Sequence, residues 1–431
     1  MLLAALQSLR QRITARSSFL GGVITLFTAS ALAQIIPLAA APFLTRLYSP
    51  DDFGVLALFL SVASLVGVVA TARYELAVML PDEEEDALHV VALALGVTVI
   101  VSVISMALLA VFGDGLVAWL RAPALRPWLV VVPLFVLVAG IQQTLVQWNT
   151  RLKRFGAVGG GTVSQSGGDA VVALSAGLAR AGAAGLIAGV ILGRTFAAMW
   201  LARELVSKLR QVRIQPARIG EMARRYSDFP GVNAAHAFAD MAHRSLLHVS
   251  ISVWFGPSAL GLFSYAVRNA RAPQTLVSGS VAQVFFQHAS QARTQGRALA
   301  PLVSQTLRGV APVAVGLLLA LLLAGPFLFG LVFGDAWTIA GEYARRVSPM
   351  LFLGVLSSPI SCLPIVLEKQ HTAFVFGLVV QCAGLIAFLS MSWAGLDFVT
   401  CVSLYSAVMT VGLSAMLAWY VRIAGRAGGD A

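Results

Sequence analysis

Charged residues are scarce in this sequence. Only 11% of the 431 residues are charged and 58% are hydrophobic, whereas roughly 25% of the residues in an average soluble domain are charged. So few charges exclude an ordinary soluble enzyme. They predict an all-α polytopic membrane protein, because a helix satisfies its own backbone hydrogen-bonding groups within lipid.

Cysteine is also rare. The three cysteines, Cys362, Cys382 and Cys401, are an odd number and all fall in apolar segments, where cysteine behaves as a small hydrophobic residue. Their number and spacing exclude a disulfide framework and indicate no metal site.

Motifs of soluble enzymes are missing as well. The sequence has no His-Glu-x-x-His and no Gly-x-Ser-x-Gly motif, and no predicted outside loop is long enough to hold a catalytic domain. Gly185, Gly189 and Gly193 imitate a phosphate-binding loop, but Arg194 stands where that loop requires lysine. Glycines four residues apart indicate close helix packing instead. We therefore predict a protein that is not an enzyme and has no catalytic residues.

Long apolar segments fill most of the chain. About 20 apolar residues cross a bilayer as a helix, and the sequence predicts twelve spans: 19–44, 53–79, 87–112, 126–148, 156–179, 182–202, 229–255, 258–284, 309–333, 347–367, 372–394 and 398–421. Span 156–179 is rich in glycine and span 229–255 has only a short purely apolar part, so both need protein neighbours. The first 18 residues show no signal-peptide cleavage site, and the first span is expected to direct insertion.

The formal net charge of +11 could suggest a nucleic-acid partner. The basic residues, however, follow the loops between spans and form no single patch, so we expect no nucleic acid. The outside loops hold only six arginines: Arg46, Arg121, Arg126, Arg180, Arg345 and Arg346. The excess of basic residues inside places both termini in the cytoplasm, and the acidic turn at 81–86 does not reverse this, because acidic residues contribute little to the rule.

Two similar loops indicate an internal repeat. Pro50 and Gly54 precede one span, and Pro257 and Gly261, 207 positions later, precede another. Each motif follows the first span of a six-span half, which predicts two six-helix bundles related by a pseudo-two-fold axis along the membrane normal. Because Pro-x-x-x-Gly is also common at the start of a helix, coincidence is the alternative. The predicted parts are an N-terminal bundle at 1–202, a basic cytoplasmic linker at 203–228 and a C-terminal bundle at 229–431.

Five arginines fall inside predicted spans: Arg73, Arg194, Arg244, Arg268 and Arg271. Facing lipid, they would cost on the order of 15 kcal/mol together, so they are expected to line an interior cavity or to extend to its edge. Arg73 and Arg194 lie near the inner ends of their spans and could reach the interface, and Arg73 could pair with Glu75. Arg268 and Arg271 share one helix face and are harder to explain in this way.

A polar stripe runs along the predicted span 229–255. His236, Asp240, His243 and Arg244 lie at positions i, i+4, i+7 and i+8, on one side of a helix, which is typical of a helix that lines water. The alternative is a surface helix at the inner leaflet. Further polar pairs with i, i+4 spacing favour a shared cavity: Gln143 with Gln147, and Gln165 with Asp169.

Four segments of the sequence resemble one known family. They are TRLYSPDDFG (45–54), ATARYELAVMLP (70–81), GLFSYAVR (261–268) followed by Pro273, and VAQVFF (281–286). With the length and the number of spans, they make the chain similar to Wzx-type flippases for lipid-linked oligosaccharides, the polysaccharide-biosynthesis branch of the multidrug/oligosaccharidyl-lipid/polysaccharide (MOP) exporter superfamily. The acidic turn at 82–86, which has no lysine, departs from the family pattern.

The resemblance implies two six-helix bundles around a cationic lumen in the bacterial inner membrane. It also implies movement of an undecaprenyl-pyrophosphate-linked oligosaccharide from the cytoplasmic to the periplasmic leaflet, for O-antigen, capsule or exopolysaccharide assembly. Membrane lipids, and the polymerase and chain-length regulator of the same pathway, are the further partners it suggests. Guanidinium groups match phosphate oxygens in pairs, so Arg268, Arg271, Arg244 and Arg73 are the expected binders of the pyrophosphate or sugar. Two alternatives are an ion-coupled multidrug exporter of the same fold and a membrane-embedded polymerase or ligase.

The energy source is a separate question. The sequence has no nucleotide-binding motif and implies no cofactor, so transport is expected to be coupled to an H⁺ or Na⁺ gradient or to run downhill. Asp240 and His243 are the candidates for ion coupling, because a carboxylate and an imidazole near Arg244 can exchange protons. The alternative is a fixed Asp240–Arg244 ion pair.

Overall fold

The computed structural model describes residues 28–209, 212 and 214–426. Over these residues the chain is helical and has no strand, which confirms the predicted all-α class. Three expectations concern residues outside the described ranges. They are those for the first 18 residues, for the start of span 19–44 and for the location of the two chain ends. The contacts divide the chain into two compact units, and each is described by itself.

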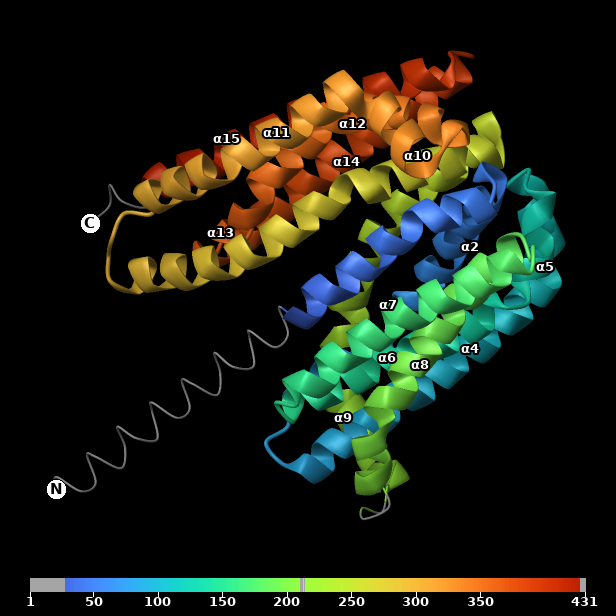
Figure 1. The fold of residues 1–431 in the computed structure, drawn as a ribbon. Coiled ribbons are helices and arrows are strands. Elements are labelled where there is room, and N and C mark those ends of the chain that lie inside the picture. The colour runs from blue at the N-terminus through green and yellow to red at the C-terminus, as the bar shows by residue number, and fades with distance from the viewer. Residues whose placement is uncertain (1–27, 210–211, 213, 427–431) are drawn as a thin grey trace. The chain divides into compact units, whose positions relative to one another are not determined.

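Unit 1 comprises Val62–Ala118 and Pro123–Met241, with the described residues up to Ala40. Its α6, α7 and α8 lie side by side (Figure 1). The glycine-rich α7 packs closely on α8, since a Cβ atom on Gly193 would lie only 2.6 Å from the carbonyl oxygen of Gln165. This confirms the predicted close helix packing. The elements are α3 (Tyr74–Ala77), α4 (Glu84–Trp119), the 3-10 turn η1 (Pro123–Leu125), α5 (Arg126–Leu129), α6 (Val132–Arg151), α7 (Phe155–Leu178), α8 (Ala183–Leu209), α9 (Pro216–Arg225) and the π-turn η2 (Phe229–Asn233).

Unit 2 comprises Ala41–Ser61, Trp119–Ala122 and the chain from Ala242 onward. It therefore contains the first part of α2 (Pro50–Gly67) and most of α10 (Ala234–Thr294). In the orange and red part of Figure 1, α12 packs against α11 and α15, and α14 against α15. The remaining elements are α11 (Ala300–Phe333), η3 (Asp335–Trp337), α12 (Thr338–Ser357), η4 (Ser358–Ile360), α13 (Leu363–Val366), α14 (Gln370–Trp393) and α15 (Phe398–Arg426).

One predicted span is not a continuous helix. The sequence predicts a single span at 53–79 with Arg73 inside it, whereas α2 ends at Gly67 and a series of turns follows. Ala72 and Arg73 have φ angles of 46° and 64°, in the left-handed region that ends a helix. Glycine followed by Val68 and Val69 has low helix propensity, which explains why the helix stops here.

Helix boundaries elsewhere follow the sequence more closely. Span 258–284 and most of span 229–255 lie within α10, which breaks at Gly256 (φ 86°) between them, and residues 229–233 form the π-turn η2. α12 ends at Ser357, just before Pro359, and a short helical turn contains Pro364, as expected because proline lacks the N–H group that a helix interior needs. α8 extends to Leu209 and α9 follows, so much of the predicted linker is helical.

The number of membrane crossings differs from the expectation of twelve. In the described ranges, nine helices are long and apolar enough to span a membrane, including one at Thr28–Leu47, or ten if the bent pair Pro123–Leu129 and Val132–Arg151 is one span. The count of twelve is therefore not confirmed. The bend of 55° in that pair occurs just before Pro133, in the first turn of α6.

The two loops of the predicted repeat contact each other in unit 2. A Cβ atom added to Gly54 would overlap the carbonyl oxygen of Pro257, and one added to Gly261 would overlap the carbonyl oxygen of Pro50. The glycine of each motif therefore contacts the proline carbonyl of the other motif. This reciprocal pair of contacts is what a local two-fold axis between the two motifs requires. The predicted boundaries 1–202, 203–228 and 229–431 stay predictions.

Candidate functional site

A partly buried polar cluster crosses α6, α7 and α8 in unit 1. Gln142 donates from Nε2 to Oε1 of Gln165 (2.6 Å) and accepts from Nη1 of Arg194 at its own Oε1 (3.1 Å). The Arg194 guanidinium also lies 4.9 Å from the ring centre of Phe135. Arg194 is thus held by side chains in the middle of α8.

Gln142 is a residue that the sequence analysis missed. The i, i+4 spacing singled out Gln143 and Gln147, which are only half-buried, whereas Gln142 is buried and makes the contact with Gln165. Asp169 lies on the same helix as Gln165, and its backbone packs on Gly193. Of the predicted supporting residues, the structure therefore brings Gln165 and Asp169 to this cluster.

Arg73 lies in the turn after α2. Its Nη1 is 3.3 Å from Oε1 of the buried Glu75, and Thr71 donates a hydrogen bond to the other carboxylate oxygen. Arg73 is thus paired with Glu75, one of the two roles that the sequence allowed.

The acidic turn at 82–86 contacts the basic linker. Lys208 Nζ lies 2.7 Å from Oε1 of Glu84, and Arg218 Nη1 lies 3.2 Å from Oδ1 of Asp86. Arg151 donates to backbone carbonyl groups of the same turn, among them that of Glu83. Two of the acidic side chains of this turn, Glu84 and Asp86, are thus paired with basic residues of the linker.

Arg244 and Arg271 lie on either side of the break in α10 at Gly256 and come within electrostatic range of each other in unit 2. Both side chains are exposed, and both act electrostatically on the imidazole of His248. The hydroxyl of Tyr405 on α15 also lies within electrostatic range of Arg271. Two of the predicted substrate-binding arginines are therefore brought together by the break in α10, which lets residues 27 positions apart approach each other.

His248 is the second residue that sequence reasoning missed. Its Nδ1 lies 3.0 Å from the hydroxyl oxygen of Ser61, and that hydroxyl already donates to the carbonyl of Ala57. Nδ1 is therefore the donor in this contact, which fixes the orientation of the ring. Ser245 donates to the carbonyl of Ser61 as well. His248 stands four residues after Arg244 and so continues the same polar stripe. The predicted stripe ended at Arg244, although its spacing also fits His248.

Arg268 makes a different contact. Its guanidinium lies 5.6 Å from the ring centre of Tyr265, within cation–π range. Tyr265 is fixed by a hydrogen bond from its hydroxyl to the carbonyl of Ala41 (3.2 Å) and by ring contacts with Phe53 and Trp337. Arg268 is exposed and rests on a rigid aromatic cluster.

The predicted ion-coupling residues are only partly described. His243 is half-buried, whereas the side chains of Asp240 and His236 lie outside what the structure describes. The Asp240–Arg244 pair therefore stays a prediction. Among the described residues, no cluster of three or more His, Cys, Asp or Glu side chains could hold a metal ion.

One family model matches most of the chain. The model described as polysaccharide biosynthesis protein matches residues 43–341. This range includes the first loop of the repeat, the α6–α8 cluster and all of α10. No curated protein sequence matches the chain.

Several solved structures share the fold. The lipid II flippase MurJ in an inward closed conformation has a TM-score of 0.72 and 13% sequence identity, over 93% of this chain and 87% of MurJ. An inward-facing multidrug resistance MATE family transporter of the MOP superfamily has a TM-score of 0.68 and 10% identity, over 94% and 95% of the two chains. At such identities the likeness establishes the fold.

Proposed function

The chain belongs to the polysaccharide biosynthesis protein family, and from this premise we propose that it is a flippase for a lipid-linked oligosaccharide. The proposed substrate is an undecaprenyl-pyrophosphate-linked repeat unit that moves from the cytoplasmic to the periplasmic leaflet of the bacterial inner membrane. The family match and a fold shared with a lipid II flippase support this proposal. The family and the solved structures that share the fold are those of transporters and not of enzymes.

The meeting of Arg244 and Arg271 is the observation that carries the proposal. A pyrophosphate with attached sugars cannot enter hydrocarbon, and guanidinium groups supply paired donors to phosphate oxygens. Both arginines are exposed, and both lie within electrostatic range of His248, with the hydroxyl of Tyr405 in range of Arg271. A basic cluster of this kind suits an anionic headgroup better than the cationic substrates of an exporter.

A transport assay separates the two functions. Proteoliposomes containing the purified protein and a fluorescent polyprenyl-pyrophosphate-linked oligosaccharide should show label crossing to the opposite leaflet, measured by its accessibility to a membrane-impermeant quencher. Empty vesicles provide the control. Transport of a cationic dye without movement of the lipid-linked sugar would favour an exporter.

The proposed orientation places both termini and the basic linker in the cytoplasm. A reporter that is active only in the periplasm should give signal when fused after Gly256 and none when fused at Arg218. The opposite pattern would reverse the topology and with it the proposed direction of transport.

A further inference from the structure

A cavity of about 640 Å³ lies between α11, α12 and α15 in unit 2. Its charged lining residues are Arg345 and Arg346, and its polar ones are Ser403, Ser406 and Thr410. The sequence placed both arginines in an outside loop, whereas they lie two turns inside α12. The cavity is within the size range of small-molecule sites, and neither the proposed substrate path nor the repeat accounts for it.

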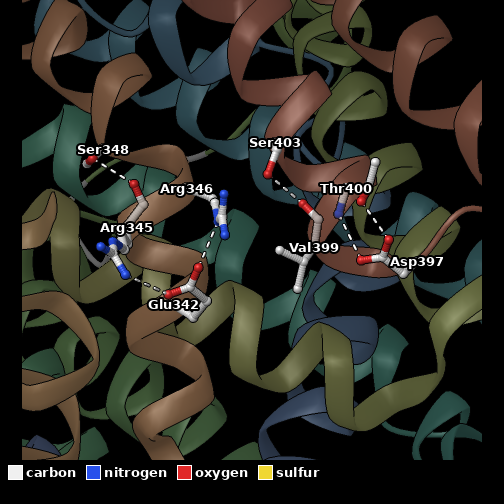
Figure 2. A network of polar contacts seen from close by, with 8 residues as sticks. All are labelled: Glu342, Arg345, Arg346, Ser348, Asp397, Val399, Thr400 and Ser403. Carbon is white, nitrogen blue, oxygen red and sulfur yellow. Dashed lines mark hydrogen bonds and ion pairs between the residues drawn. The ribbon is translucent and has the colours of Figure 1, made fainter.

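The two arginines share one carboxylate. Glu342 accepts a hydrogen bond from Nε of Arg346 (2.7 Å) and a longer one from Nη1 of Arg345 (3.5 Å), as Figure 2 shows. Both arginine side chains are 46% exposed, so their remaining donors can reach a ligand. Two guanidinium groups and one carboxylate leave one positive charge at the cavity.

The hydroxyl group of Ser406 is a second indication of a ligand in this cavity. Ser406 lines the cavity and is only 2% exposed, and in the described structure its Oγ has no hydrogen-bond partner. By contrast, Ser403 donates to the carbonyl of Val399 and Thr410 to that of Ser406. A buried polar group without a partner is costly, so a ligand that accepts from Ser406 would remove this cost.

Ser403, the lining residue nearest the start of α15, lies between one and two helical turns from that end of the helix. Trp393, at the end of α14, is 85% exposed, and tryptophan is enriched at the membrane interface. From the start of α15 nearby, a rise of 1.5 Å per residue places Ser403 about 8 Å and Thr410 about 18 Å along the helix. The cavity thus runs inward from near the interface, and its apolar side includes Leu322 and the exposed Val411.

We propose that this cavity binds the headgroup of an anionic phosphodiester lipid of the bilayer, of the phosphatidylglycerol type. The single positive charge of the Glu342–Arg345–Arg346 cluster matches the single negative charge of a phosphodiester. A pyrophosphate carries more negative charge than the cluster can neutralise. Ser406 donates to a lipid oxygen, and the glycerol and upper acyl chain lie along Leu322 and Val411. This inference does not depend on the proposed transport function.

Native mass spectrometry of the full-length protein tests the proposal. Phosphatidylglycerol should bind more tightly than phosphatidylethanolamine, which has the same phosphate but no net charge. Arg346→Gln should weaken phosphatidylglycerol binding about fivefold, and Glu342→Gln should strengthen it by a similar factor, because one basic residue near a lipid surface contributes about that much. Opposite effects of two neighbouring substitutions cannot result from misfolding.

Two further variants locate the site. Ala407→Leu should fill the cavity and abolish tight binding without changing any charge. Arg126→Gln removes an exposed arginine that is paired with Asp114 in unit 1 and should leave binding unchanged. Equal binding of the two phospholipids, or no effect of Ala407→Leu, would overturn the proposal. Displacement of phosphatidylglycerol by undecaprenyl phosphate at equal concentration would assign the cavity to the carrier lipid instead.

Discussion

Gly54 lies against the carbonyl group of Pro257, and Gly261 lies against that of Pro50 in the same way. A Cβ atom on Gly261 would also lie 2.7 Å from the backbone nitrogen of Gly54. Small residues that allow such close backbone approach are typical of membrane helix interfaces. The two motifs of the repeat thus form the point at which α2 and the second part of α10 cross.

Substitution of Gly54 by leucine should destabilise the protein strongly. The new side chain would meet rigid backbone, and overpacking of a tight core costs about 1–3 kcal/mol or more. We expect a clear fall in the melting temperature of the detergent-purified protein. Gly309→Leu is the matched control, because Gly309 is helical and has no atom within 4 Å of the added Cβ position. Equal melting temperatures for the two variants would contradict the close contact.

The sequence predicted the architecture well where hydrophobicity alone decides it. The helical class, the glycine packing of α7 on α8 and the break near Gly256 follow from composition and turn residues. The predicted end of the span at 53–79 was wrong, because the spanning helix ends at Gly67 and hydropathy does not register the left-handed backbone at Ala72 and Arg73. Apolar length alone does not give the count of crossings, because the described part of the chain has nine spanning helices, or ten if the bent pair formed by η1–α5 and α6 is one span.

The candidate site was less predictable than the fold. Spacing along one helix placed Gln143 and Gln147 together, but the contact with Gln165 is made by Gln142, which the packing of α6 on α8 turns inward. His248 gains its position from Ser61, 187 residues away in sequence. Such long-range contacts depend on tertiary packing and leave no local periodic signal.

Gln142→Ala should destabilise unit 1. The substitution leaves Nη1 of Arg194 and Oε1 of Gln165, both on half-buried side chains, without their present partner, and the loss of one hydrogen bond costs about 0.5–1.5 kcal/mol. The expected result is a lower melting temperature, measured in detergent. Gln143→Ala, one position along α6, serves as the control and should have a much smaller effect. If both variants melt alike, the cluster contributes nothing specific to stability.

Asp397 caps the start of α15, and its contribution should depend on pH. The side chain of Thr400, and then its backbone N–H, donate to this carboxylate and lower its pKa below the ordinary value of 3.8. A lowered pKa means that the ionised form stabilises the folded state at pH values above 3.8 and that this stabilisation disappears as the pH falls through the folded-state pKa. Asp397→Ala should therefore lower the melting temperature at pH 6, with a difference from the unchanged protein that shrinks below pH 4. A difference that stays constant down to pH 3 would exclude the charged cap.

Arg244→Ala and Arg271→Ala should each reduce flipping of the lipid-linked oligosaccharide more than tenfold, because a hydrogen bond to a charged group contributes about 1.5–3 kcal/mol. Lysine at position 271 should restore only part of the rate, since it lacks the paired donors of arginine. Arg126→Ala is the control for loss of an exposed arginine. The measurement is the initial flipping rate at equal protein density in proteoliposomes. Unchanged flipping by the double alanine variant would remove both arginines from substrate binding.

Asp240 and His243 are proposed to couple transport to an ion gradient. Asp240 stands four residues before Arg244 on α10, so its carboxylate can pair with that arginine in one state and take up a proton or Na⁺ in another. Asp240→Asn removes the exchangeable charge and keeps the size of the side chain. We expect flipping by this variant to become independent of an imposed pH or Na⁺ gradient, while the unchanged protein responds to it. His243→Gln tests whether the imidazole shares the role, and it should shift the pH at which the response is half-maximal. If the Asp240→Asn variant keeps the full gradient dependence, the carboxylate only neutralises Arg244, and the driving force enters elsewhere or comes from consumption of the product outside.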